Sequence, residues 1–137
     1  MKHIILFFLL VAASILHANA ADDVAIKRFV DAKTSLLQTQ VNQLSLAINL
    51  LKTETLSDQD KFERIGEPSF SAVDAVLANA GYSVRTFYQF AAENEEAISI
   101  WLGFNMLAAD HMAALEIERE GLISEYDLLI NSPANGN

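Results

Sequence analysis

Residues 97–115, AISIWLGFNMLAADHMAAL, constrain the fold more than any other stretch of the chain. The only polar residues of this stretch are Ser99, Asn105, Asp110 and His111. A helix that is apolar on nearly every side must be buried on nearly every side. We therefore expect this stretch to form the central helix of an all-α protein, with other helices packed around it.

The first twenty residues match a secretory signal peptide. Lys2 and His3 precede an apolar run over residues 4–16, and Ala18-Asn19-Ala20 follows as an A-x-A cleavage motif. The run is shorter than the roughly 20 residues that span a bilayer, which argues against an uncleaved anchor. The sequence predicts cleavage of residues 1–20 before Ala21 and a periplasmic or secreted protein.

Removal of residues 1–20 from the 137-residue chain leaves 117 residues, enough for one domain with its own core. The chain contains no cysteine, so it forms no disulfide and offers no thiolate ligand to a metal. Many small secreted animal domains rely on disulfides, which favours a bacterial envelope protein here. We expect a single helical-bundle domain over residues 21–132 and a disordered tail over residues 133–137.

Residues 22–55 contain no Gly or Pro and carry apolar residues at helical spacing. The main stripe consists of Val30, Leu37, Val41, Leu44, Ile48 and Leu51, and it is widened by Phe29, Leu36, Leu46, Ala47 and Leu50. A stripe of this width predicts one long amphipathic helix that packs against more than one neighbour, as in a bundle.

Capping patterns divide the middle of the chain into shorter helices. Ser57 is expected to cap a short helix over residues 58–65, and Gly66-Glu67-Pro68 forms a corner after it. Ser69 or Ser71 is expected to cap a helix that runs to Ala80 and is followed by Gly81. Ser83 is expected to cap a helix that begins at Val84. Together with the long helix and the apolar stretch, these patterns predict a compact bundle of four to five helices.

One row of side chains in the second half steps by three and four residues. Its members are Phe87, Phe90, Asn94, Ala97, Trp101, Phe104, Ala108, His111, Leu115, Arg119, Leu122, Tyr126 and Leu129. This spacing places all thirteen on one helical face, with a bend or break expected near Asn94. Gly103 and Gly121 lie on the opposite side, where they would let another helix approach closely. A homodimer that covers part of the central helix is an alternative to burial within one chain.

Charge is concentrated in the second half of the chain. The whole sequence has 18 acidic and 9 basic residues, and over residues 65–137 only Arg85 and Arg119 oppose eleven acids. This field disfavours nucleic acid and anionic membranes and favours a basic protein partner, although solubility alone would also explain it. The candidate partner-binding residues are the acids around the apolar stretch: Glu93, Glu95, Glu96, Glu116, Glu118 and Glu120.

Two polar members of the row, His111 and Arg119, are expected on the buried face, where they must find partners. His111 is the only histidine after the signal peptide, and a hydrogen-bonded histidine inside the bundle is the simplest interpretation. A pH sensor, a metal ligand and a catalytic group are the alternatives. Arg119 lies among acidic neighbours, which predicts a salt bridge at the bundle edge, while those acids argue against an anchor for an anionic ligand.

We find no motif for catalysis, a cofactor or a metal site. The sequence lacks a nucleophile elbow, a glycine-rich phosphate loop and the Glu-x-x-His pairs of helical di-iron proteins. Four aromatic residues at helical spacing, Phe87, Phe90, Trp101 and Phe104, are expected in the core rather than around a ligand.

The sequence therefore predicts a non-catalytic exported protein that binds a protein partner, as an inhibitor or immunity protein binds a basic enzyme or toxin. No cofactor, no nucleic acid and no integral membrane association after signal cleavage are expected. A helical envelope chaperone or adaptor for unfolded clients is the alternative. An enzyme or small-ligand carrier that uses His111 near the aromatic residues is a third hypothesis.

Overall fold

The computed structural model describes residues 2–53, 57, 59–60 and 68–131, and this part of the chain is helical without any strand. The helices are α1 (Lys2–Lys52), α3 (Pro68–Asn79), α4 (Val84–Glu93), α5 (Glu95–Phe104) and α6 (Met106–Asn131). Side chains are described from residue 23 in α1 and from residue 72 in α3. The predicted all-α class is confirmed. The short helix expected over residues 58–65 and the tail over residues 133–137 lie largely or wholly outside the described residues.

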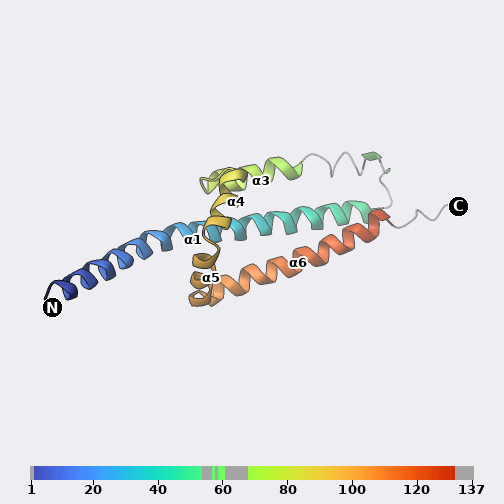
Figure 1. The fold of residues 1–137 in the computed structure, drawn as a ribbon. Helices are drawn as coiled ribbons and strands as arrows, with labels where there is room; N and C mark the ends of the chain where they lie inside the picture. The colour runs from blue at the N-terminus through green and yellow to red at the C-terminus, as the bar shows by residue number, and fades with distance from the viewer. Residues whose placement is uncertain (1, 54–56, 58, 61–67, 132–137) are drawn as a thin grey trace.

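Helix α1 runs through the middle of the molecule, and the other helices lie around its C-terminal half (Figure 1). Helix α3 runs back along one side of α1, α4 and α5 cross it, and α6 returns beside it in the same direction as α1. Two ion pairs link the parallel helices α1 and α6: Lys33 to Glu116 at 2.8 Å, and Lys52 to Glu125. Lys52 also lies in the last turn of α1, where a positive charge offsets the negative end of the helix dipole.

The core is built on α1. Among the described residues, α1 supplies nine of the fourteen buried hydrophobic side chains: Ile26, Phe29, Val30, Ala32, Leu36, Leu37, Val41, Ala47 and Ile48. The predicted contact of this helix with several neighbours is confirmed, because α1 packs on α3, α4, α5 and α6. Leu46, which was expected in its stripe, is instead 58% exposed. The central helix of the bundle is therefore α1 and not the 97–115 stretch.

Aromatic side chains join α1 to α4 near the turn after α3. The Phe29 ring stacks on Phe87, with centroids 4.7 Å apart, and on Phe90 at 5.2 Å. Tyr82 meets Phe29 edge-on at 6.4 Å, and the Arg28 guanidinium lies 5.3 Å from the Tyr82 ring centroid. Offset aromatic pairs of this kind add to the free energy gained from burying the rings. A second cluster, Leu37 and Val41 with Met112 and Leu115, holds α6 against α1.

The expected caps form at both ends of the α3–α4 turn. The Tyr82 N–H donates to the Leu77 carbonyl at 2.8 Å, and the Gly81 N–H donates to the Ala78 carbonyl at 2.9 Å. This is a Schellman motif, and it places Gly81 at φ +80°, where a side chain would be strained. Ser83 then forms a capping box with Thr86 at the start of α4. The Ser57 hydroxyl likewise accepts from the Asp60 N–H at 3.2 Å.

Two asparagines interrupt the row of the second half. The Asn94 side-chain amide donates to the Phe90 carbonyl at 2.9 Å, and that of Asn105 donates to the Trp101 carbonyl at 2.8 Å. Each side chain thereby occupies a carbonyl near the end of the preceding helix. The break near Asn94 was predicted, whereas the break at Asn105 was not. The chain direction bends by 113° between α5 and α6 at this second break. The expectation of one continuous helix over residues 97–115 is therefore wrong.

The aromatic junction can be tested by replacing Phe29, which is 3% exposed, with alanine. Phe29→Ala removes two stacked contacts and leaves a cavity, so the free energy of unfolding should fall by about 3–5 kcal/mol. Leu46→Ala is the matched control on the same helix and should change it by no more than about 0.5 kcal/mol. Urea unfolding followed by circular dichroism measures both. Equal losses from the two variants would contradict the placement of the core.

Candidate functional site

The predicted partner-binding acids lie on separate elements. Glu93 ends α4 and accepts a hydrogen bond from Gln89 at 2.7 Å, while Glu95 and Glu96 are exposed in the first turn of α5. Glu118 and Glu120 are exposed on α6. Glu116 is only half-exposed and pairs with a lysine of α1. Glu116 therefore forms an ion pair that links α6 to α1.

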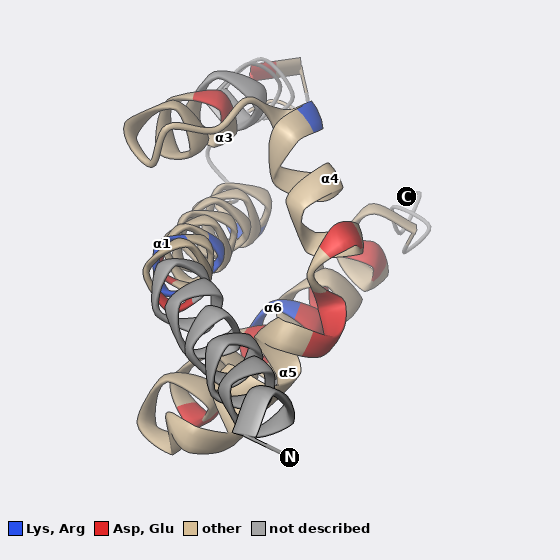
Figure 2. Ribbon diagram, turned by 60° about the vertical axis from the view of Figure 1, so that its left-hand side comes forward, with Lys and Arg blue, Asp and Glu red and all other residues tan. Residues whose placement is uncertain are grey.

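Negative charge gathers along α6, whereas most of the described Lys and Arg positions lie on α1 (Figure 2). Two acids of α6, Glu116 and Glu125, are neutralised by α1 lysines. The other four are exposed and form no ion pair with any residue that the structure describes: Asp110, Glu118, Glu120 and Asp127. Their charge is available to a partner.

His111 is exposed, so the expectation that it lies on the buried face is wrong. The buried positions of this part of α6 are Met112 and Leu115, which contact Leu37 and Val41 of α1. The predicted row steps three residues from Ala108 to His111, whereas the inner side of α6 steps four residues to Met112 and then rejoins the predicted row at Leu115 and Arg119.

Arg119 is partly buried between α6 and α1, as the row predicts. Its Nη1 donates to the Gln40 Oε1 at 3.3 Å, while its buried Nε finds no acceptor among the described residues. The expected salt bridge of Arg119 with a neighbouring glutamate does not form among these residues. Arg119 is thus a polar link between two packed helices.

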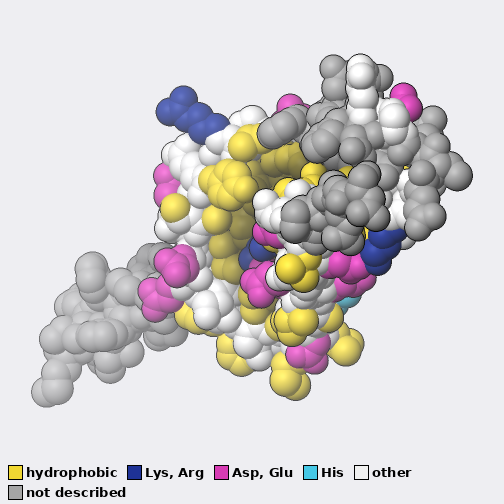
Figure 3. Space-filling model, turned by 90° about the vertical axis from the view of Figure 1, so that its right-hand side faces the viewer, with side chains coloured by type: hydrophobic (Ala, Val, Ile, Leu, Met, Phe, Trp, Pro, Cys, Tyr) yellow, Lys and Arg dark blue, Asp and Glu magenta, His cyan; other side chains and the backbone are white. Residues whose placement is uncertain are grey.

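The feature that the sequence reasoning missed is a cluster of exposed apolar side chains where α5 turns into α6. We call it the apolar corner: Ile100 is 55% exposed, Phe104 86%, Met106 72% and Leu107 89%. Phe104 was expected in the core, yet the turn at Asn105 directs it outward. Hydrophobic side chains stand out to solvent along the lower edge of the molecule, with acidic ones between them (Figure 3). Large exposed apolar patches mark binding surfaces.

The two glycines expected to admit a neighbouring helix do not do so within the described chain. A Cβ built on Gly103 or Gly121 would meet no atom within 4 Å. Both residues are exposed, and the break at Asn105 places them on different helices. Within the described residues, no other helix packs closely against either glycine.

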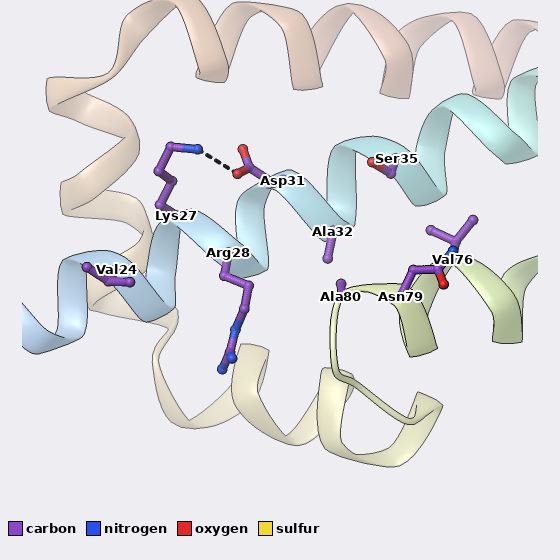
Figure 4. A pocket seen from close by; sticks show the side chains of 9 residues that line it. All are labelled: Val24, Lys27, Arg28, Asp31, Ala32, Ser35, Val76, Asn79 and Ala80. Atoms are coloured by element: carbon purple, nitrogen blue, oxygen red, sulfur yellow. Dashed lines mark hydrogen bonds and ion pairs between the residues drawn. The ribbon is translucent and has the colours of Figure 1, made fainter.

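A groove of about 530 Å³ lies between α1 and α3 (Figure 4). Its lining residues are Val24, Lys27, Arg28, Asp31, Ala32, Ser35, Val76, Asn79 and Ala80. Lys27 pairs with Asp31 at 2.6 Å, and Arg28 lies against Tyr82. The charged groups of this groove thus contact neighbouring side chains.

The described residues hold no group of three histidine or acidic side chains placed to bind a metal ion. None of the described helices alone is long and apolar enough to cross a membrane, while α5 and α6 reach that length and composition only as a bent pair. Among known proteins, no family model, no curated protein and no solved structure matches this chain.

The position of His111 predicts that its replacement is tolerated. His111→Ala should change the free energy of unfolding by no more than about 0.5 kcal/mol, because an exposed side chain loses few contacts. The neighbouring variant Met112→Ala should cost about 2–5 kcal/mol, since Met112 is 9% exposed and packs on α1. Urea unfolding measures the stability of both variants. A larger loss of stability for His111→Ala than for Met112→Ala would contradict the burial of Met112 against α1.

The Arg119 Nε–H has no hydrogen-bond acceptor among the described residues, which predicts that an apolar side chain of similar length can replace arginine here. Arg119→Met removes a buried N–H that has no described acceptor, so stability should stay within about 1 kcal/mol or rise. Arg119→Glu puts a negative charge at this position, between Glu116 and the other acids of α6, and the repulsion between like charges should lower the stability of the chain. Thermal unfolding of both variants tests this, and a marked loss for Arg119→Met would mean that the guanidinium has a further partner.

Proposed function

We propose that this chain is an exported, non-catalytic binding protein of inhibitor or immunity type, whose apolar corner docks on a basic protein partner. The observation that carries the proposal is the exposure of Phe104, Met106 and Leu107 at one turn of the chain. Apolar surface removed from water contributes about 25 cal/mol per Å². A partner that covers these side chains would recover free energy that the isolated chain leaves unused.

The charge of the neighbouring helix supports a basic partner. Asp110 follows the apolar corner by three residues, and Glu118, Glu120 and Asp127 continue the negative charge along α6. Opposite charge on a partner speeds the encounter and excludes unsuitable partners, while buried apolar side chains supply most of the affinity. The signal-like residues 1–20 support export, with a basic secreted or periplasmic protein as the partner.

A helical envelope chaperone or adaptor is the second candidate, and the same exposed corner favours it. A chaperone binds apolar segments of many unfolded clients, whereas an inhibitor binds one folded partner. Light scattering of a thermally aggregating enzyme separates them. Suppression of aggregation for several unrelated clients, lost in Phe104→Ser/Leu107→Ser, would support the chaperone and contradict the dedicated binding protein.

The proposal predicts a single partner that depends on the apolar corner. The immobilised chain is exposed to envelope and secreted proteins of its own source, and the captured protein is identified, purified and titrated by calorimetry. Phe104→Ser/Leu107→Ser should weaken binding by at least about tenfold, since burial of each such side chain contributes about 1.5–3 kcal/mol.

Tyr88→Ser is the matched control for this experiment, because Tyr88 is an exposed aromatic residue of α4 outside the corner. It should leave the affinity within about twofold. Absence of any specific basic partner would refute the proposal, and so would equal effects of the corner and control variants.

A further inference from the structure

Helix α6 is apolar on two sides. Its inner side packs on α1 through Met112 and Leu115. A second row, which we call the outer stripe, steps along the exposed side: Met106, Asp110, Ala113, Ile117, Gly121, Ser124 and Leu128. Met106 and Ile117 are each 72% exposed, and Leu128 is 70% exposed. A helix with apolar residues on opposite sides presents two packing faces, and the described chain covers only one of them.

The spacing of the outer stripe suits a helix as its partner. Steps of four and three residues continue from residue 106 to residue 128, a length of about 33 Å at 1.5 Å per residue. Ala113 and Gly121 are small, and a Cβ on Gly121 would meet nothing within 4 Å, so a partner backbone can approach there. Amphipathic helices bind such faces through apolar residues at the same steps.

The edges of the outer stripe are acidic. Helical geometry places Glu120 and Asp127 along one edge and Glu118 along the other, and all three are exposed without an ion pair to any described residue. Asp110 adds a fourth negative charge within the stripe. A second copy of this chain would bring these acids against each other, and an anionic membrane or a nucleic acid would be repelled. The complementary occupant has positive charge on both sides of an apolar face.

We propose that the outer stripe of α6 binds a cationic amphipathic helix of a protein partner, with Met106 and Ile117 against its apolar face and the acidic edges against its lysines or arginines. This inference rests on the proposed function and specifies its partner. Met106 belongs to both the apolar corner and the outer stripe, so the two surfaces adjoin.

The test uses the full chain and synthetic helices of about 22 residues, which match the stripe at 1.5 Å per residue. The first peptide carries Leu and Ala on one face and Lys on both edges. A second has the same composition in scrambled order, and a third has Glu in place of Lys. Calorimetry at 50 and 300 mM NaCl should detect binding of the first peptide only, weaker at the higher salt because ions screen exposed charges.

Variants locate the binding face. Ile117→Ser and Glu118→Lys/Glu120→Lys should each weaken binding of the cationic helix at least tenfold. Leu46→Ser on α1 and Asp23→Lys/Asp74→Lys are controls with matched exposure and charge change, and they should stay within twofold. Circular dichroism confirms that each variant remains helical.

Several outcomes would overturn the inference. If the scrambled peptide binds equally well, charge alone explains the binding. If the Glu peptide binds equally well, apolar contact alone explains it. A dimer in sedimentation that dissociates in Ile117→Ser would assign the stripe to a second copy. Binding to phosphatidylcholine vesicles that Ile117→Ser abolishes would assign it to a membrane. If a captured natural partner needs Phe104 and Leu107 but tolerates Ile117→Ser and Glu118→Lys/Glu120→Lys, the proposed function stands and this inference fails.

Discussion

The apolar side chains of α1 form two adjoining rows, and the need to cover both decides where α3, α4, α5 and α6 lie. Phe29 and Leu36 belong to the row that meets α3 and α4, whereas Leu37 and Val41 meet α6. Leu102 of α5 packs against both clusters, which makes the crossing helix part of one continuous core. The ion pairs between α1 and α6 are partly exposed and contribute at most about 1 kcal/mol each. Apolar contact with α1 therefore dominates the packing.

The break at Asn105 follows from the same constraint. A straight helix over residues 84–130 would be about 70 Å long and would touch α1 along a single line. Division at Asn94 and Asn105 lets the chain cross from the α3 side of α1 to the α6 side, and each asparagine side-chain amide donates to a carbonyl near the end of the preceding helix. The turn has a consequence for the surface, since it directs Phe104 and Leu107 into solvent. Core packing and the exposed corner are thus two results of one chain path.

The candidate surface combines this corner with a helix that has more apolar residues than α1 can cover. Most acids of α6 stand clear of the α1 lysines, and they border the uncovered side. Such a combination of apolar centre and charged rim is typical of surfaces that bind another protein. Among the acids that the sequence singled out by charge, Glu118 and Glu120 border this surface, while Glu116 pairs with Lys33 of α1.

The sequence by itself determined the all-α class, the caps at Ser83 and Gly81, the break at Asn94 and the acidity of the second half, because these depend on neighbouring residues and on composition. Only the tertiary structure decided that α1 is central, that Asn105 ends a helix, and that Met112 rather than His111 faces the core. Helical spacing fixes which residues share a face, but α6 has apolar residues on two faces. Contact with α1 selects one of them, and that selection leaves the other exposed.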